Sequence, residues 1–401
     1  MSDTPARKGI APSLTQAGLL RSGRTASPTS RKLVRWMREE ALPFWATQGW
    51  DAQHGGFHER VFFTGKTDDA APRRTRVQWR QIYVYSHAAI LGWHDGLRLA
   101  LKGLEHMIGR AWAPDGAPGF VHILNPDGSV RDKKRDSYDH AFALLALTWL
   151  AKASGDAQVH ALLKMVFAFC DTQLTDENGF LREAIPPELP RRQNPHMHML
   201  EAMLAMVEVL DHAEAKTRAK RYRNMLEGTF FDPETALLLE FFDDHWRAVT
   251  DETGASLVEP GHMAEWVWLI RKYERLFGQK ASPLATHLLG AALRGAEPMA
   301  GFLIDEIDTH QKARKTSRRL WPQTELVKAW LAQAEIGADR ADEAAEQAMD
   351  ALMTHYLAGP FPGGWYDQFD GRGGIAGNTV PASTLYHLFV ATAEGHRLLG
   401  S

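Results

Sequence analysis

The stretch GGFHER at residues 55–60 decides the fold, because it is one copy of a short phrase that returns along the chain. Each copy places glycine before an aromatic residue and then polar or acidic residues. The further copies are PGFVHI (118–123), NGFLRE (178–183), AGFLIDE (300–306) and GGWYDQF (363–369). The aromatic residues Phe57, Phe120, Phe180, Phe302 and Trp365 are separated by 63, 60, 122 and 63 residues. One gap is twice the period, so we expect a degenerate copy without its glycine at TALLLEFFDD, residues 235–244.

The segments between the copies read as amphipathic helices. Apolar residues recur at i, i+3, i+4 and i+7 in KLVRWMREEALPFW (32–45), HAFALLALTWLAKAS (140–154), HMLEAMLAMVEVLDHA (198–213) and TELVKAWLAQAEIGA (324–338). Six units of about sixty residues, each able to hold two helices, predict an all-α fold. We expect an (α/α)6 barrel of six helix pairs, with the short Gly-aromatic hairpins and a sugar-sized pocket at one end.

Composition excludes several classes of protein. The chain has 401 residues and a formal net charge of −3, which does not favour a nucleic-acid or membrane surface. Its one cysteine, Cys170, excludes an internal disulfide and lies in an apolar stretch, where we expect it to be buried. We expect residues 1–30 to be a polar, disordered arm and residues 31–401 to form one catalytic domain. No apolar run is long enough for a signal peptide or a membrane span, and we expect a cytoplasmic monomer or homodimer.

Three helices are expected to begin beside a proline and to carry a histidine in their first two turns. Asn194-Pro195 starts a helix with His196 and His198, Pro260 precedes His262, and Pro381 precedes His387. His196 and His198 are two residues apart and cannot face the same point, so they are not a metal clip. Neither HExxH nor a paired-cysteine zinc pattern is present, and we expect no metal. A helix N-terminus disfavours an imidazolium ion, so we expect these histidines to be near-neutral bases.

Further candidate residues accompany the histidines. Arg80 could bind sugar hydroxyls or pair with an acid, and Tyr138 with Asp139 could line a pocket or cap a helix. Glu265 follows His262 by three residues. Trp321 and Gln323 lie at another proline-marked helix start, and Trp365, Asp367 and Gln368 lie in the last hairpin. We expect no cofactor, because neither GxxxxGK[ST] nor a GxGxxG that opens a helix occurs, and GxSxG is also absent.

Four motifs carry a resemblance to a known family. RRQNPHMHMLEA (191–202), EPGHMAEWVWLI (259–270), RRLWPQTE (318–325), and GGWYDQFD (363–370) followed by VPASTLYH (380–387) resemble the N-acylglucosamine 2-epimerase superfamily. They are most similar to its mannose isomerase branch, which is related to the sulfoquinovose isomerases. The resemblance covers the chain beyond the polar arm.

The resemblance implies carbohydrate metabolism without metal or cofactor: a monosaccharide isomerase that interconverts D-mannose and D-fructose, or D-lyxose and D-xylulose, through a cis-enediolate. It implies His262 and His387 as the acid/base pair. It also implies substrate binding by a wider set of residues: Arg80, Tyr138, Asn194, His198, Glu265, Trp321 and Gln368. A base with a pKa near the working pH suits removal of a proton next to a carbonyl.

Other functions stay open at this point. A mannose 2-epimerase would use the same residues and return the proton to the opposite face of C2. An inverting glycosidase would need two separated carboxylates, for which Glu265 and Asp367 could be proposed. A ring of helices can also serve as a non-catalytic binding scaffold.

Overall fold

The computed structural model describes residues 27–295 and 301–399. Most of the predicted polar arm, 1–26, therefore lies outside the described residues. The last residues of that arm are already structured, because helix α1 begins at Pro28 and the Ser27 hydroxyl accepts a hydrogen bond from the Ser30 amide at 3.0 Å. The polar side chains of Ser27, Thr29 and Ser30 are typical of a loop in the sequence. In the structure they are buried, with Ser27 as the N-cap and the other two in the first turn of the helix.

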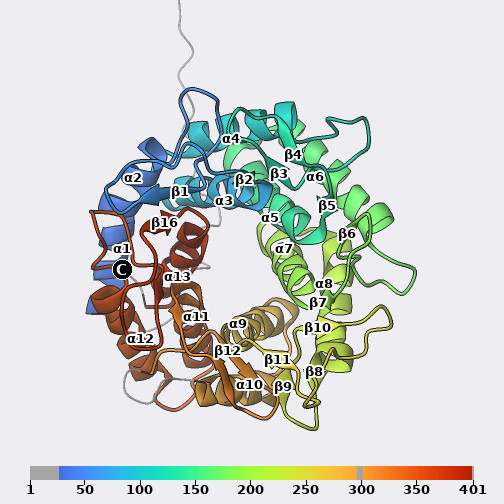
Figure 1. Cartoon of the computed structure of the whole chain (residues 1–401), viewed down its shortest axis with the longest axis vertical. Helices are drawn as coiled ribbons and strands as arrows, with labels where there is room; N and C mark the ends of the chain where they lie inside the picture. The colour runs from blue at the N-terminus through green and yellow to red at the C-terminus, as the bar shows by residue number, and fades with distance from the viewer. Residues whose placement is uncertain (1–26, 296–300, 400–401) are drawn as a thin grey trace, which may run out of the picture.

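Within the described residues, six helices form a closed inner ring (Figure 1). Each packs against the next, and the last packs against the first. They are buried around most of their circumference, so they are apolar on nearly all sides. These inner helices are α3 (Thr75–Leu91), α5 (Ser137–Ser154), α7 (Asn194–Leu210), α9 (Pro260–Phe277), α11 (Leu320–Glu335) and α13 (Thr384–Leu399).

An outer helix packs against each inner helix. Five of the outer helices follow their inner partner in the chain: α4 (Leu97–Arg110), α6 (Ala157–Phe169), α8 (Ala213–Met225), α10 (Pro283–Arg294) and α12 (Ala341–His355). The sixth position is taken by α1 (Pro28–Trp36), which continues through the wider turn Met37–Ala41 into α2 (Leu42–Thr47) and packs on α13 and α12. The first of the described helices thus completes the last pair. The predicted (α/α)6 barrel is confirmed.

Short antiparallel strands join consecutive units at one end of the barrel. The pairs are β1 (Arg60–Phe62) with β16 (Thr379–Pro381), β5 (Arg135–Asp136) with β6 (Ala184–Ile185), β7 (Arg191–Arg192) with β10 (Phe241–Phe242), β8 (Phe231–Asp232) with β9 (Leu237–Leu238), and β14 (Arg318–Arg319) with β15 (Gln368–Phe369). Two sheets have three strands: β2 (Arg73–Arg74), β3 (Ile123–Leu124) and β4 (Val130–Asp132), and β11 (Leu257–Val258), β12 (Glu306–Asp308) and β13 (Ala313–Lys315). Because β1 pairs with β16, the hairpins close the ring as the helices do.

The repeat is in a slightly different register from the one predicted. In each of four hairpins, one backbone amide donates to a glutamine or histidine on the following inner helix: Phe57 to Gln78, Phe120 to His140, Leu181 to His196 and Leu303 to Gln323. The equivalent residues of the third and fifth copies are therefore Leu181 and Leu303, not the aromatic residues before them. Leu181 fills the buried position, while Phe180 stacks on Trp246 with ring centroids 4.3 Å apart.

The degenerate copy predicted at 235–244 is a hairpin in the structure. It is formed by β8 and β9, and Leu237 and Leu238 are buried. Ala236, the residue before them, has a φ of 57°. Glycine takes this left-handed conformation without strain, as Gly179 does in the preceding copy, whereas alanine takes it only when its surroundings hold it there.

Helix α13 begins later than predicted. Pro381 ends strand β16, and the helix starts at Thr384. The amide of Ala382 donates to the Glu59 carbonyl, which keeps this segment extended and bound to the first hairpin.

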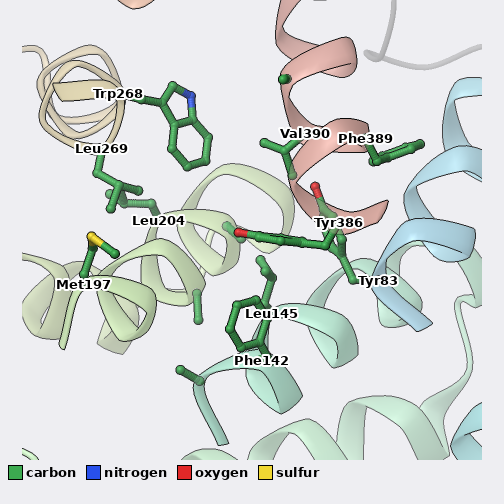
Figure 2. Packing of buried hydrophobic residues seen from close by; sticks show 14 of the residues in the cluster. Tyr83, Phe142, Leu145, Met197, Leu204, Trp268, Leu269, Tyr386, Phe389 and Val390 are labelled. Atoms are coloured by element: carbon green, nitrogen blue, oxygen red, sulfur yellow. The ribbon is translucent and has the colours of Figure 1, made fainter. Parts of the chain in front are cut away.

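The centre of the ring is packed with apolar and aromatic side chains from several inner helices, among them Phe142, Leu204, Trp268 and Phe389 (Figure 2). Toward the C-terminal ends of α7, α9, α11 and α13, ion pairs replace them. Glu208 bonds Lys272 at 2.8 Å and Arg275 at 3.1 Å, and Glu335 bonds Arg397 at 2.7 Å. Among the described helices, none is long and apolar enough to cross a lipid bilayer.

Candidate active site

The three histidines singled out by their helix starts lie near the N-terminal ends of neighbouring or facing inner helices. His198 is on α7, His262 on α9 and His387 on α13, and each is at most 6% exposed. Each uses Nδ1 to bond a buried glutamate: Glu201 at 3.0 Å, Glu240 at 2.9 Å and Glu325 at 2.8 Å, respectively. This shared arrangement fixes each imidazole ring and leaves Nε2 as the atom available for other contacts.

His262 is held by groups from two other segments. Its Nδ1 bonds Glu240, and its Nε2 lies 3.2 Å from the Asn194 amide nitrogen. Burial by itself lowers the pKa of His262, but the carboxylates of Glu240 and Glu259 outweigh burial and raise the pKa to about 9. The expectation that this histidine is a near-neutral base is therefore wrong, because two carboxylates beside the ring overcome the effect of the helix N-terminus.

His387 has the opposite protonation preference. Burial lowers its pKa well below the ordinary value, and the charges of Arg80 and Lys328 act in the same direction. Its glutamate partner does not reverse this, because Glu325 also pairs with Lys328, whose Nζ lies 2.5 Å from a carboxylate oxygen. His387 is therefore neutral near pH 7. No described residue bonds its Nε2, which is free to accept a proton.

His198 and His196 have different surroundings. Burial lowers the pKa of His198 to about 4, and Glu201, its partner, is also bonded by the Tyr386 hydroxyl. His196 instead bonds the Leu181 amide at 2.8 Å through Nε2 and the Arg192 carbonyl at 3.1 Å through Nδ1. Only His198 belongs to the histidine–glutamate cluster, whereas His196 holds a hairpin to the start of α7.

A buried acidic cluster with one lysine lies below the histidines. Burial and the neighbouring Glu325 raise the pKa of Glu265 well above its ordinary value, which favours the protonated form of this carboxyl group. Neither of its oxygens has a hydrogen-bond partner among the described residues, so it is able to donate to a ligand. The Lys328 ammonium lies 3.9 Å from the Trp268 ring centroid and neutralises part of the cluster.

Arg80 and Tyr138 contact each other close to the start of α13, the helix that carries His387. The Arg80 guanidinium donates to the Tyr138 hydroxyl at 2.6 Å and to the Ser383 carbonyl at 3.2 Å. It also stacks on Phe142 at 4.3 Å, and no described carboxylate pairs with it. Because the alternative of an acid partner is not realised, Arg80 is the cation of this region that remains available to a ligand oxygen.

Trp321 lies near both His262 and His387. Its ring centroid is 5.0 Å from that of His262 and 5.8 Å from that of His387. The approach of α9 to this indole needs the glycine at 261, because a Cβ there would lie 2.6 Å from the Trp321 ring. An indole beside two imidazoles offers an apolar face to a sugar ring.

The last hairpin is placed at the rim. Gln368 is half-buried on β15 opposite Arg319, and no described contact joins its side chain to the histidines. Asp367 accepts a hydrogen bond from Thr384 at 2.7 Å, and burial raises its pKa to about 6. Tyr138 and Asp139 divide their roles: Tyr138 contacts Arg80, while Asp139 pairs with Arg76 and His122.

Sequence reasoning missed the partners of the histidines. Neither helical periodicity nor the proline-marked helix starts single out Glu201, Glu240, Glu325 or Lys328. Glu325 could have been found in RRLWPQTE, because that motif lies at an inner helix start. Glu240 carried a weaker signal, since it lies in the copy of the repeat that lost its glycine.

Several of these groups place enough ligand-type atoms together to consider a metal. Three sets have one such atom per residue within 4.8 Å of one another: His198 with Glu201 and Glu265, His262 with Glu240 and Glu259, and His387 with Glu265 and Glu325. In each set the histidine Nδ1 already bonds a glutamate of the same set. A cation would have to displace these bonds, so a metal-free site stays our prediction.

A cavity of about 860 Å³ lies outside this cluster. It is lined by the hairpin residues Asp176–Asn178, by Arg191 and by Asp244–Trp246, among others, and none of the nine candidate residues lines it. It adjoins the rim through Glu183, which bonds Arg192 before α7.

An (α/α)6 barrel with acid/base side chains gathered at the inner helix starts is suited to carbohydrate chemistry, and comparison with known proteins identifies the class as a carbohydrate isomerase or epimerase. The N-acylglucosamine 2-epimerase family description matches residues 55–391, and the chain belongs to this family. The resemblance read from the four motifs is thereby confirmed.

Individual relatives lie within the same group. The chain is 34% identical over 379 residues to a protein named mannose-6-phosphate isomerase from Rhizobium meliloti (strain 1021), covering 90% of this chain and 95% of the relative. It is 26% identical over 312 residues to a D-mannose isomerase from Thermobifida fusca, covering 71% and 75%. The structure of cellobiose 2-epimerase from Spirochaeta thermophila DSM 6192 matches with a TM-score of 0.81 at 21% identity, covering 92% and 96%.

Proposed function

We propose that the protein interconverts D-mannose and D-fructose without a metal. The observation that carries this proposal is the opposite protonation of two histidines beside one indole: His262, with a pKa raised to about 9, and His387, with a pKa far below its ordinary value. One can donate a proton while the other accepts one at the same pH, as an aldose–ketose isomerisation requires.

The reaction follows from these two states. In the open-chain aldose, His387 Nε2 removes the proton from C2, and the electrons of that C–H bond form the C1–C2 double bond. The C1 carbonyl oxygen takes a proton from His262, which gives a cis-enediol. The proton on His387 then returns to C1 while the O2 proton passes to His262, which leaves a carbonyl at C2. Both histidines end in their starting states.

Neighbouring groups stabilise the developing charge on O1 and O2. Arg80 is a cation that has no carboxylate partner among the described residues, and Glu265 in its protonated form is a donor. Both would act in a mostly buried region, where a hydrogen bond to a charged oxygen is stronger than in water. We assign Tyr138, Asn194, His198, Trp321 and Gln368 to substrate positioning.

The arginines near the inner helix starts favour a neutral sugar. Arg74 bonds Glu59, Arg76 bonds Asp139, Arg192 bonds Glu183, and Arg319 bonds Asp305. Arg80, which has no carboxylate partner among the described residues, is assigned to O1 and O2, and a phosphate group would have to compete with these carboxylates for any of the other four arginines. We therefore propose D-mannose rather than the phosphorylated substrate in the name of the Rhizobium relative, and the D-mannose isomerase from Thermobifida fusca supports the same choice.

The test is incubation with D-mannose in D2O, with and without a chelator, followed by NMR. The proposal expects fructose as the first product, with deuterium at C1 where solvent exchange competes with transfer, and an equal rate with chelator. Glucose formed without an initial fructose phase would instead establish a 2-epimerase on the same residues. Turnover of mannose 6-phosphate but not of mannose would overturn the neutral substrate.

A further inference from the structure

The six hairpins share a polar position that reaches the next inner helix. Two residues after the buried apolar position, the copies carry Glu59, His122, Glu183, Glu240, Asp305 and Asp367. All six are buried or half-buried, and in each the side chain contacts the N-terminal part of the inner helix that follows. This internal symmetry allows one copy to be compared with another inside a single chain.

In three copies the acid has a purely local role. Its carboxylate accepts hydrogen bonds from both the backbone amide and the guanidinium of an arginine just before the helix. The pairs are Glu59 with Arg74, Glu183 with Arg192, and Asp305 with Arg319. Such a pair ties the hairpin to the helix and neutralises the acid at the same time.

The fourth copy departs from this pattern. The residue that precedes α9 is Glu259 in place of arginine, and Glu259 pairs instead with Arg319 of the next unit. Without an arginine partner, Glu240 extends to His262, two residues inside the helix, at 2.9 Å. The copy that lost its glycine is thus also the copy that directs its acid to a histidine.

Glu240 is held firmly in this position. The Gln193 amide donates to its Oε2 at 3.0 Å, and the Trp266 indole N–H donates to the Gln193 carbonyl oxygen at 2.9 Å. Gln193 and Trp266 are fully buried and Glu240 is 2% exposed. Such a chain of bonds keeps the carboxylate oriented when the imidazole gains or loses its proton.

We propose that Glu240 is a positioning residue that accepts the Nδ1–H of His262 and thereby presents Nε2 as the proton-transferring atom, with Asn194 as its partner. This deepens the proposed function and rests on it for the role of His262 in turnover. The Asn194 amide suits both states of the ring. When the imidazole is neutral, the Asn194 amide nitrogen, 3.2 Å from Nε2, donates a hydrogen bond to it. When the imidazole is protonated, the side-chain amide would rotate by half a turn and its oxygen, which has no partner among the described residues, would accept a hydrogen bond from Nε2.

Other charges around His262 do not replace Glu240. Glu259 directly precedes α9 and Glu265 lies on it, and His198 faces His262 from α7. Glu259 is already paired with Arg319, and burial raises the pKa of Glu265 well above its ordinary value, which favours its uncharged form. Glu240 is the carboxylate that bonds the ring directly.

The experiment compares Glu240→Gln with Glu59→Gln, a matched change at the same hairpin position in a copy where the acid bonds an arginine. The imidazole signals of histidine-labelled protein are titrated by NMR, and the His262 signal is assigned by its loss in His262→Asn. We expect Glu240→Gln to move the His262 titration to lower pH by about one unit or more, since an adjacent opposite charge has an effect of this size. Glu59→Gln should leave it in place.

Kinetics on D-mannose provide the second readout. Glu240→Gln should lower kcat by roughly 10²-fold with little change in KM, and should move the alkaline limb of the kcat/KM profile together with the NMR titration. Glu240→Asp should partly restore kcat. An unchanged His262 titration in Glu240→Gln would overturn the proposal, even if mannose is turned over. If Glu240→Gln does not fold, Gln193→Leu, which removes the bond that holds Glu240 together with the acceptor of the Trp266 indole, must shift the same titration or the proposal fails.

The titration also separates the two proposals. A shifted His262 signal in a protein that converts no mannose would refute the proposed function and leave the positioning of His262 by Glu240 intact. Turnover of mannose with an unshifted His262 signal would support the proposed function and refute the positioning of His262 by Glu240.

Discussion

His262 and His387 lie near the same indole, with ring centroids 5.0 Å and 5.8 Å from Trp321, and each bonds a glutamate through Nδ1, yet their pKa values move in opposite directions. The difference comes from what else the glutamate touches. Glu325 shares its charge with Lys328, whereas Glu240 has Glu259 nearby and bonds neither a lysine nor an arginine among the described residues.

Replacing either histidine should abolish turnover without unfolding the protein. His262→Ala and His387→Ala each remove a proton-transfer group, and we expect kcat to fall by roughly 10²- to 10⁴-fold. Steady-state kinetics on D-mannose measures the loss, with circular dichroism as the check on folding. The exposed His160→Ala is the control. Near-full activity in either variant would refute the acid/base assignment.

The rate should depend on pH with a defined alkaline limit. His262 must be protonated to donate, so kcat/KM should fall as the pH rises through about 9. His387 must be neutral to accept, and since its pKa is lowered, the acid limb should lie below pH 6.5. A profile of kcat/KM from pH 4 to 10 tests both limits. An alkaline limb near the ordinary histidine pKa would contradict the effect of Glu240 and Glu259.

The raised pKa of His262 also affects folding. A group whose pKa is higher in the folded state stabilises the fold below its unfolded value, and this stabilisation is lost as the pH rises through the folded value. Between pH 6.5 and about 9, His262 should therefore make the wild type lose stability with rising pH faster than His262→Asn does. Chemical denaturation at several pH values compares the two slopes, and equal slopes would argue against the shift.

The two histidines in NPHMH should be separable by experiment. His196→Ala removes a buried partner of the Leu181 amide and should destabilise the fold by about 1–3 kcal/mol while kcat stays within a few-fold. His198→Ala should have the larger effect on kcat or KM. Denaturant unfolding and steady-state kinetics on both variants test which histidine is structural and which is catalytic. A catalytic loss in His196→Ala that exceeds that of His198→Ala would reverse the assignment.

Lys328 should be required for stability because of the acids around it. It is fully buried with Glu325, Glu265 and Glu201 close by, and Lys328→Met would leave these groups without a buried cation. Removing one partner of a buried ion pair costs about 3–5 kcal/mol. Urea unfolding measures it, and Lys328→Met combined with Glu325→Gln should recover part of the loss. No recovery would mean that the lysine acts mainly through its contact with Trp268.

The barrel was predictable from sequence because its signal is periodic. Hairpins recur at about sixty residues, and helical spacing fills the segments between them. The first residue of each helix was predicted less accurately than the barrel. Pro381 predicted the start of a helix, yet the backbone pairing of β16 with β1 delays the helix to Thr384. Asn194 was expected to cap α7, but it is the first helical residue and turns its side chain to His262.

The charge states could not be predicted from single helices. A helix N-terminus alone favours a neutral imidazole, and this rule holds for His198 and His387 but fails for His262. Glu240, the acid that raises the pKa of His262, is 22 residues away in the sequence, in the hairpin that lacks the glycine of the repeat. Local sequence patterns identify the candidate acid/base residues. The residues that shift the pKa values of those groups are brought close to them only by tertiary contacts.

The way the ring closes bears on when the enzyme becomes active in the cell. The first inner helix supplies Arg80 and the last supplies His387, and the Arg80 guanidinium bonds the Ser383 carbonyl just before α13. Strand β16 and helix α13 also complete the hairpin ring and cover α1. A nascent chain emerging from the ribosome can assemble the earlier helix pairs one after another, but it cannot bring the acid and the base together until α13 has been translated. Catalytic competence should therefore appear abruptly once α13 has been synthesised and has packed into the ring.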